Sequence, residues 1–285
     1  MTQCKTIMTI FGTRPEAIKM APLVQELRRR EKLRCLCCVT AQHREMLDSV
    51  LDIFSLRPEY DLDIMEPRQS LSTITSKCLL GLDGVFEQAR PDLVLVHGDT
   101  STTFAGALSA FYHKIPVGHV EAGLRTHDRY SPFPEEMNRA MVGRLAQLHF
   151  CPTAANRRNL EAEGITEGIF VTGNTVIDAL GSTVREGFRF STDVLNALDY
   201  QGKKVIVVTC HRRETTARAW STSCPPLPAL PGAMPAARSL STPSTSPRWC
   251  RSAPTGTWTA CPTSTSSPRS PPMRCTTSWR AATWS

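Results

Sequence analysis

Residues 6–40 read TIMTIFGTRPEAIKMAPLVQELRRREKLRCLCCVT, and this stretch decides the fold. The apolar runs Thr6–Phe11 and Leu33–Thr40 predict two buried strands. Between them, Pro15–Arg29 predicts a helix with proline at its start and arginines at its end, where cations suit the helix dipole. A strand, a helix and a second strand in this order indicate two parallel strands joined by a helical crossover.

The same alternation continues to about residue 210, which predicts an α/β fold with a Rossmann-like parallel sheet. These runs are too apolar for half-exposed strands, so helices should cover both faces of the sheet. Further strands are predicted at Asp92–His97, Pro116–Val120, Leu148–Cys151, Ile169–Thr172 and Lys204–Cys210. Further helices are predicted at Arg44–Phe54, Leu71–Gln88, Thr103–Tyr112, Pro134–Gln147, Ala154–Glu163 and Asn174–Gly187. The last of these leads, through a short linker helix, to the predicted strand at Lys204–Cys210.

Composition divides the chain at Glu214. The 71 residues that follow contain 12 Pro, 13 Ser and 13 Thr but no Ile, Val, Phe, Asp, Glu or Lys. The whole net charge of +7 equals the seven arginines of this tail, so residues 1–214 are neutral. A neutral body predicts neither nucleic acid nor a membrane surface as partner.

The tail has a composition that a packed domain does not have, because it lacks the apolar residues that a core needs. Ser, Pro, Thr, Ala, Arg, Trp, Cys and Gly make up 66 of its 71 residues, and all eight have C or G as second codon base. We therefore expect residues 215–285 to be a disordered tail read in a shifted frame from a GC-rich gene. The alternative is a genuine Ser/Pro/Thr-rich stalk, which five tryptophans and four cysteines disfavour.

The seven cysteines before the tail are odd in number. Cys35, Cys37 and Cys38 fall in a predicted strand, so we interpret them as buried thiols of a reducing compartment. No apolar run approaches the roughly 18–20 residues of a membrane span. The sequence predicts a cytoplasmic protein.

Polar residues follow the predicted strands, where ligands of parallel sheets bind. Gly12 and Thr13 precede a helix that carries Arg14 and Lys19, which predicts a phosphate site at the helix start. The alternative is an ordinary turn with solvated charges.

Acids occupy the later strand ends: Asp99, Glu121 and, at the next helix start, Glu135, while His211 follows the last strand. Acids and a histidine in one cleft suit proton transfer. The alternatives are that Asp99 caps a helix and that Glu135 interacts with the positive end of a helix dipole. The sequence contains no G-x-x-x-x-G-K-[ST] and no G-x-G-x-x-G, and its His, Cys and Asp residues lack metal-ligand spacing. We expect neither a metal nor a cofactor.

Five motifs together resemble one family. GTRPEAIKMAP, VHGDTSTT, HVEAGLR, PFPEEMNR and HRRE occur in this order over about residues 4–214 and are similar to the non-hydrolysing UDP-N-acetylglucosamine 2-epimerases. The resemblance implies the two-domain GT-B fold. It implies an N-terminal domain at 1–170, linker helices at 171–203, the first strand of a second domain at 204–214, and then the tail.

The resemblance also implies the reaction, a C2 inversion that converts UDP-GlcNAc into UDP-ManNAc for cell-surface polysaccharide synthesis. UDP leaves to give a 2-acetamidoglucal and then adds back, with the proton delivered to the other face. The match to the family's motifs implies that Asp99, Glu121, Glu135 and His211 are catalytic residues. It does not show which of them removes the C2 proton. Arg14 and Lys19 match positions near the nucleotide.

A second UDP-GlcNAc binds as an activator in many bacterial members of the family. The corresponding residues here are Gln42, Met46, Arg68, Glu136 and Arg212. The resemblance further implies a homodimer for the full-length form, with a UDP-sugar as substrate.

Three alternatives remain from the sequence. The substrate could be another UDP-sugar of the diacetamido-uronate type, the protein could be a GT-B glycosyltransferase, or the chain could be a non-catalytic binding fragment. Because the second domain of the family is missing after Glu214, we expect this truncated chain to be inactive.

Overall fold

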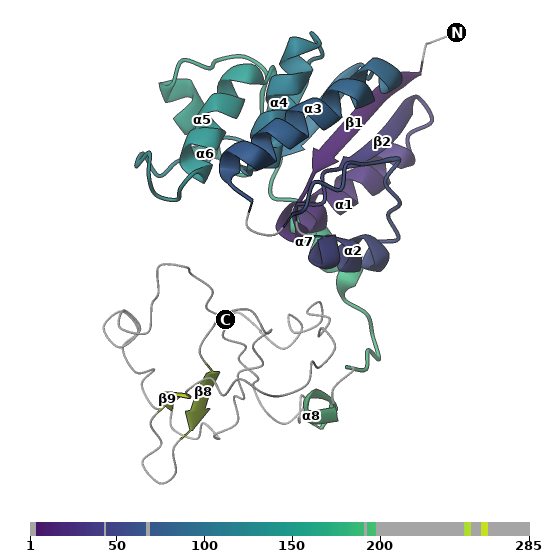
Figure 1. The fold of residues 1–285 in the computed structure, drawn as a ribbon, viewed down its shortest axis with the longest axis vertical. Coiled ribbons are helices and arrows are strands. Elements are labelled where there is room, and N and C mark those ends of the chain that lie inside the picture. The colour runs from purple at the N-terminus through teal and green to yellow at the C-terminus, as the bar shows by residue number, and fades with distance from the viewer. Residues whose placement is uncertain are drawn as a thin grey trace. The chain divides into compact units, whose positions relative to one another are not determined.

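A computed structural model describes residues 4–42, 44–66, 69–190, 193–197, 248–251 and 258–261. Contacts between Cα atoms group the chain into two units, 1–186 and 187–285. The first unit is a seven-stranded sheet with helices on both faces (Figure 1). Its α/β class and Rossmann-like sheet agree with the sequence prediction.

The sheet is parallel throughout and runs in the order β3-β2-β1-β4-β5-β6-β7. The chain order reverses between β1 and β4, which is the point where open parallel sheets bind ligands. The strands are β1 Lys5–Phe11, β2 Leu33–Val39, β3 Tyr60–Asp61, β4 Leu93–His97, β5 Val117–Val120, β6 Leu148–Cys151 and β7 Ile169–Val171.

Helices are expected on both faces of this sheet, because right-handed crossovers that run in opposite directions from the β1–β4 switch point lie on opposite faces. The helices of the first unit are α1 Arg14–Arg28, α2 Arg44–Ile53, α3 Leu71–Ala89, α4 Ser101–Tyr112, α5 Glu135–Leu145, α6 Ala154–Ala162 and α7 Val176–Thr183. In Figure 1, α1, α2 and α7 lie on one side of the strands, and α3 to α6 lie on the other. No described helix has the length and apolar content needed to cross a membrane.

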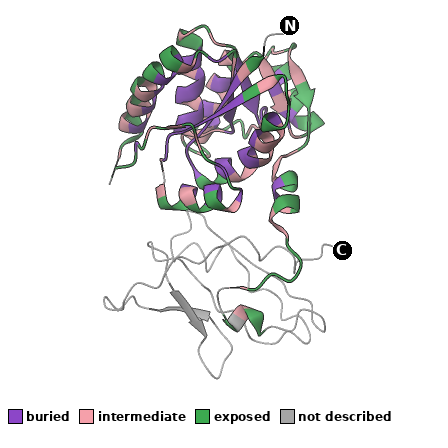
Figure 2. Ribbon diagram, turned by 90° about the vertical axis from the view of Figure 1, so that its right-hand side faces the viewer, coloured by how far each residue is buried: buried purple, intermediate pink, exposed green. Residues whose placement is uncertain are grey.

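Two hydrophobic clusters follow from the alternation of side chains along β1. Ile7 and Phe11 point to the face covered by α1 and α2. Met8 and Ile10 point to the other face, where they pack with residues of α3 and α4. The strands are accordingly buried in Figure 2, while the outer faces of the helices are exposed.

The predicted strands and helices of the first unit are present, with two differences. The helix predicted at Asn174–Gly187 is shorter, since α7 starts at Val176 and ends at Thr183. Asn174 lies before the helix and accepts a hydrogen bond from the Val176 N–H, a typical arrangement for an Asn at a helix start. The edge strand β3 was not predicted, because two residues show no periodicity.

Cys35, Cys37 and Cys38 are buried free thiols in β2, as the sequence predicts. Burial raises the pKa of the Cys35 thiol to about 11 and that of Cys37 to about 12. Thiols protonated in this way behave as small apolar side chains.

The described part of the second unit is small. It contains the helix α8, Asp193–Asn196, and two antiparallel strands, β8 Arg248–Arg251 and β9 Trp258–Cys261. These strands lie in the tail, where the sequence predicts no ordered element; Trp and Thr have high strand propensity, which is consistent with the pairing. The strand predicted at Lys204–Cys210 lies outside the described residues.

Candidate active site

The turn between β1 and α1 is closed by the carboxylate of Glu16. Its Oε2 accepts hydrogen bonds from the N–H groups of Gly12 (3.0 Å) and Thr13 (2.7 Å). Its Oε1 accepts from the hydroxyl of Thr100 (2.7 Å), in the turn after β4, and from that of Thr103 (3.0 Å), in the first turn of α4. Glu16 thus joins the two turns at the switch point of the sheet.

This arrangement limits the phosphate site that the sequence predicts at the start of α1. The N–H groups of Gly12 and Thr13 already donate to Glu16, so they are not available to a phosphate. An anion at this place can still interact with the positive end of the α1 dipole and with the cations Arg14 and Lys19. Arg14 is exposed, and its guanidinium has no partner among the described residues.

Glu121 follows β5 with a left-handed backbone, φ 63°, and such strain in a non-glycine residue is often found at functional sites. Its Oε1 accepts from Lys19 Nζ at 2.5 Å and from Asn174 Nδ2 at 2.9 Å. Burial raises the pKa of this carboxyl, but interactions with His97, Lys19 and Asn174 lower it by more. The net pKa lies below the ordinary value, so Glu121 is ionised at neutral pH.

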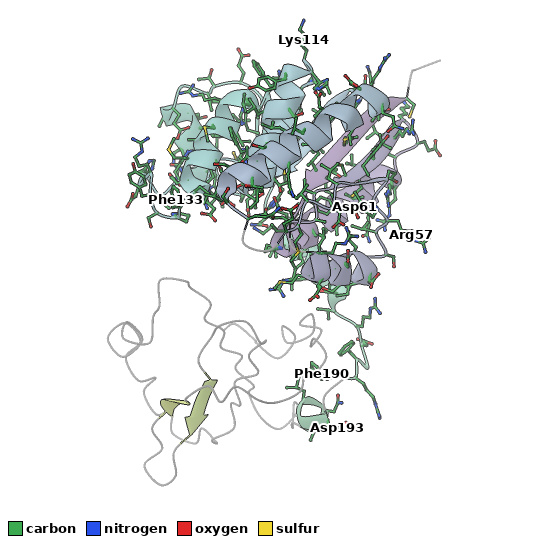
Figure 3. The ribbon with its side chains drawn as sticks, in the orientation of Figure 1. Arg57, Asp61, Lys114, Phe133, Phe190 and Asp193 are labelled. Atoms are coloured by element: carbon green, nitrogen blue, oxygen red, sulfur yellow. The ribbon has the colours of Figure 1, made fainter. Side chains whose placement is uncertain are left out.

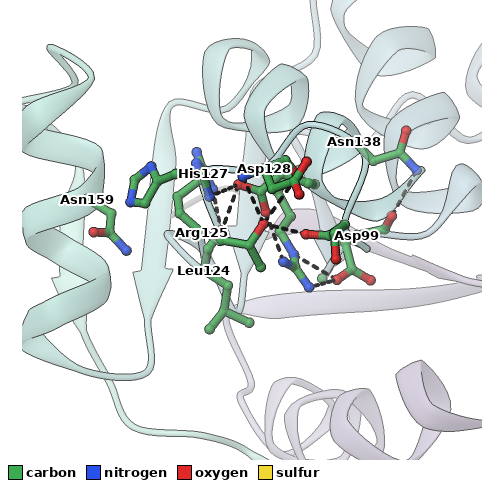
Figure 4. Close-up of polar contacts among 12 residues, drawn as sticks. Asp99, Leu124, Arg125, His127, Asp128, Asn138 and Asn159 are labelled. Carbon is green, nitrogen blue, oxygen red and sulfur yellow. Dashed lines mark hydrogen bonds and ion pairs between the residues drawn. The ribbon is translucent and has the colours of Figure 1, made fainter. Parts of the chain in front are cut away.

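Asp99 follows β4, the strand next to β5, and an arginine holds its carboxylate. Arg139 on α5 donates Nε–H and Nη2–H to Asp99 Oδ2 at 2.8 and 2.6 Å. Asn138 donates to the backbone oxygen of Asp99 at 2.9 Å, as Figure 4 shows. Asp99 does not cap α4, because Thr100 is the capping residue.

Glu136 supports the loop that follows β5. Its Oε1 accepts from the N–H groups of Thr126 and His127, both at 3.0 Å, and its Oε2 accepts from Arg139 at 3.1 Å. Burial raises the pKa of Glu136, but these hydrogen bonds outweigh it and lower the pKa overall. The neighbouring Glu135 is half-buried and has no hydrogen-bond or ion-pair partner among the described residues.

The structure therefore brings Lys19 and Glu121 into contact at the carboxyl end of β5 and places Asp99 at the carboxyl end of the neighbouring β4, while Glu135 is the first residue of α5. The Gly98 N–H donates to the Val120 oxygen at 2.9 Å, which brings the two strand ends into contact. Figure 3 shows Asp61, the last residue of β3, and Phe133, in the loop before α5, away from Lys114, which precedes β5. Carboxylates with cations in this arrangement can transfer protons and hold a diphosphate.

The other residues predicted from the sequence lie elsewhere. Gln42 follows β2, and its buried Oε1 has no partner among the described residues. Met46 on α2 is 47% exposed. Arg68, His211 and Arg212 lie outside the described residues.

Four residues of this region were not predicted as site residues: Glu16, His97, Arg139 and Asn174. Arg139 stands within the quoted PFPEEMNR motif, three residues after Glu136, a spacing that places two side chains on one helix face. His97 is the last residue of β4, and Asn174 follows β7, so their positions at strand ends could have identified them. In the described part of the chain, no group of three His, Cys, Asp or Glu side chains could hold a metal ion.

Comparison with known proteins adds an independent finding. The family model described as UDP-N-acetylglucosamine 2-epimerase matches residues 25–249. A UDP-N-acetylglucosamine 2-epimerase of Bacillus subtilis is 58% identical over 210 residues, which cover 73% of this chain and 54% of the relative. The chain spans a little over half the length of the curated relatives it matches.

Solved structures give the same result for the fold. A crystal structure of a UDP-N-acetylglucosamine 2-epimerase is 59% identical, with a TM-score of 0.65, and the match covers 69% of this chain and 52% of that one. The UDP-GlcNAc 2-epimerase from Neisseria meningitidis, bound to UDP-GlcNAc, is 55% identical with a TM-score of 0.61. That match covers 62% of this chain and 48% of the other.

Proposed function

Because this chain belongs to the UDP-N-acetylglucosamine 2-epimerase family, we propose that it carries the N-terminal part of an active site that interconverts UDP-GlcNAc and UDP-ManNAc. The observation that supports this most is the pair of carboxylates Asp99 and Glu121 on adjacent strand ends. Both are held by cations, Arg139 and Lys19. The Neisseria meningitidis relative binds UDP-GlcNAc, which supports a UDP-sugar as the substrate here.

The proposed chemistry is an elimination followed by an addition. A base takes the C2 proton, its electron pair forms the C1–C2 double bond, and the C1–O bond breaks with its electrons going to UDP. The reverse addition returns UDP to C1 and delivers a proton to the other face of C2. Asp99, Glu121, Glu135 and His211 are the groups proposed for these proton transfers, each of which needs a positioned acid or base.

Arg14 and Lys19 have the charge needed to hold the departing diphosphate. Arg14 is exposed at the start of α1, where the helix dipole also favours an anion. Lys19 lies on the same helix and reaches Glu121. One cation could thus contact both the leaving group and a catalytic carboxylate.

The activator site, the homodimer and the cytoplasmic location belong to the same proposal. Gln42, Met46, Arg68, Glu136 and Arg212 are the proposed activator residues. The Oε1 of Gln42 has no partner among the residues that the structure describes, which supports a ligand there, whereas both oxygens of Glu136 are engaged within the chain. The six described cysteines form no disulfide, which suits a reducing compartment.

A chimera tests the proposal. Residues 1–214 of this chain are joined to the part of the Bacillus subtilis relative that follows the position aligned with Glu214. With UDP-GlcNAc in D₂O, NMR should show formation of UDP-ManNAc and deuterium at C2 of both sugars, since the C2 proton exchanges through the base.

The intact relative is the positive control, and the chimera with Glu121→Gln is the negative control. A folded chimera that leaves UDP-GlcNAc unchanged, while the intact relative converts it, would contradict the proposal. Activity only on a diacetamido-uronate UDP-sugar, or transfer of the sugar to an acceptor, would favour the corresponding alternative.

A further inference from the structure

The two oxygens of Glu121 have different surroundings. Oε1 accepts two hydrogen bonds, one from Lys19 Nζ on α1 and one from Asn174 Nδ2 in the segment between β7 and α7. Oε2 accepts none from any residue that the structure describes. The carboxylate is therefore fixed through one oxygen, while the other remains available.

The orientation of the Asn174 amide is set by the start of α7. Its Oδ1 accepts a hydrogen bond from the Val176 N–H at 3.0 Å. This contact requires the oxygen to face the helix, so the NH₂ group faces Glu121. Both ends of the amide are thus engaged, one in starting a helix and the other in holding a carboxylate.

The space around Oε2 is lined by His97 and Gly98. His97 is 3% exposed, its ring nitrogens have no hydrogen-bond partner among the described residues, and its Nε2 lies 3.7 Å from Oε2. That separation is too long for a hydrogen bond. A Cβ placed on Gly98, which has φ 69°, would lie 3.7 Å from Oε2, so glycine leaves this side open.

We propose that Asn174 is a positioning residue for Glu121: with Lys19 it holds Oε1, so that Oε2 is the oxygen presented for proton transfer. This inference rests on the proposed function, since it assigns a task within the same site. Asn174 does not touch the substrate in this proposal and acts only through Glu121.

The alternative is that Asn174 merely starts α7. Two substitutions separate these roles, because Asp and Ser both keep an oxygen that can accept the Val176 N–H. Asn174→Asp places a second carboxylate against Oε1, whereas Asn174→Ser removes the donor. Ser182→Asp adds the same charge near the far end of α7 and serves as the matched control.

The first measurement uses the full chain without substrate. The chain carries ¹³C-labelled glutamate carboxyl groups, and the Glu121 signal is assigned from its absence in Glu121→Gln. The charged or titratable groups facing this carboxylate are Lys19 and His97. Asn174→Asp should raise the titration midpoint of Glu121, and Asn174→Ser should raise it less, because each weakens the stabilisation of the ionised form. Ser182→Asp should leave the midpoint unchanged.

The second measurement uses the chimera of residues 1–214 with the Bacillus subtilis relative. Both Asn174 variants should lower kcat roughly 10- to 100-fold, the scale of a small misplacement of a catalytic group, with KM nearly unchanged. Asn174→Asp should also move the lower limb of the kcat–pH profile to higher pH. Ser182→Asp should leave both constants unchanged.

An unchanged Glu121 midpoint in folded Asn174→Asp would overturn the proposal, as would normal kcat in both variants of an active chimera. If the parent chimera has no activity but the midpoint shifts as expected, the proposed function fails while the positioning of Glu121 by Asn174 stands. The two failures are therefore distinguishable.

Discussion

At the scale of single residues, Glu16 and Glu121 show how surroundings give two carboxylates different tasks. Glu16 is fully buried, and burial raises its pKa although four hydrogen bonds from Thr100, Gly12 and Thr13 oppose this. Both of its oxygens accept hydrogen bonds. Within the described part of the chain, only one oxygen of Glu121 accepts hydrogen bonds, and its pKa is lowered. The first arrangement suits a structural link, and the second suits a proton acceptor.

The sequence analysis names Glu121 as a candidate and not Glu16, but residue types alone do not show why the two acids have different tasks. Both come within five residues of a strand end, and both have a glycine and an arginine within four residues. The distinction depends on Thr100 and Thr103, which lie more than 80 residues from Glu16, and on Asn174, which lies 53 residues from Glu121. Motifs identify residue types at strand ends, whereas hydrogen-bond partners across the sheet appear only in the folded chain.

The proposed catalytic residues give the first prediction. In the chimera, Asp99→Asn, Glu121→Gln, Glu135→Gln and His211→Asn should each lower kcat roughly 10²- to 10⁴-fold, as expected for loss of a positioned acid or base. Steady-state kinetics with UDP-GlcNAc measure this. Asp128→Asn, an exposed acid of the loop after β5, is the control. Near-normal turnover in any one variant removes that residue from the catalytic set.

The buried histidines predict acid sensitivity. Burial lowers the pKa of His97 to about 4 and that of His119 to about 3. An unfolded histidine titrates near 6.5, so between about pH 6.5 and 4 the unfolded chain binds protons that the folded chain does not. Stability therefore falls as pH falls through this window, by roughly 2 kcal/mol per histidine at pH 5.

Urea unfolding at pH 7 and pH 5 measures this loss. His97→Gln should reduce the difference between the two pH values, while His127→Asn, at an exposed position with φ 64°, should not change it. Equal unfolding free energies at pH 7 and pH 5 in the parent chain would show that these histidines are not buried neutral groups.

At the scale of helices and strands, the apolar runs were sufficient to predict six of the seven strands of the main sheet. The prediction works because buried parallel strands are continuously apolar, as in LVLVH of β4. It fails for Tyr60–Asp61, where pairing of β3 with β2 is set by neighbours in space rather than by residue pattern. Helix ends were less accurate for the same reason, as at Thr183.

The contact between α6 and the turn after β5 gives a prediction at this scale. Gly123 has φ 81°, and a Cβ there would lie 2.2 Å from the backbone oxygen of Asn156. Gly123→Ala should therefore lower the free energy of unfolding by about 2–4 kcal/mol, from strained φ and from displacement of backbone. Gly164 has φ 79° with open space around it, so Gly164→Ala should lose only about 1–2 kcal/mol.

Urea unfolding of the two variants measures the difference. Because both alanines take a left-handed conformation, the comparison isolates the close approach to Asn156. Equal losses in the two variants would mean that α6 lies further from the turn than the structure shows.

At the scale of the whole molecule, the tail composition leads to a prediction about the gene. We propose that residues 215–285 are read in a shifted frame. Reading the gene one base back after the codon for Glu214 should then give a sequence that continues the match to the second half of the relatives. Sequencing across this codon tests the proposal, and a restored frame with no such match would contradict it.

The chain by itself should convert little or no UDP-GlcNAc. It spans a little over half the length of its curated relatives, and the described residues place Asp99 and Glu121 at the carboxyl ends of two adjacent strands of one sheet. An elimination needs groups on both sides of the sugar and a site closed to water, because the glucal intermediate and UDP must stay together for the addition. A coupled assay for UDP-ManNAc with the purified 285-residue chain and the chimera at equal concentration measures this. We expect turnover from the chimera and almost none from the chain, and comparable turnover from both would show that residues 1–285 already contain every group that the reaction needs.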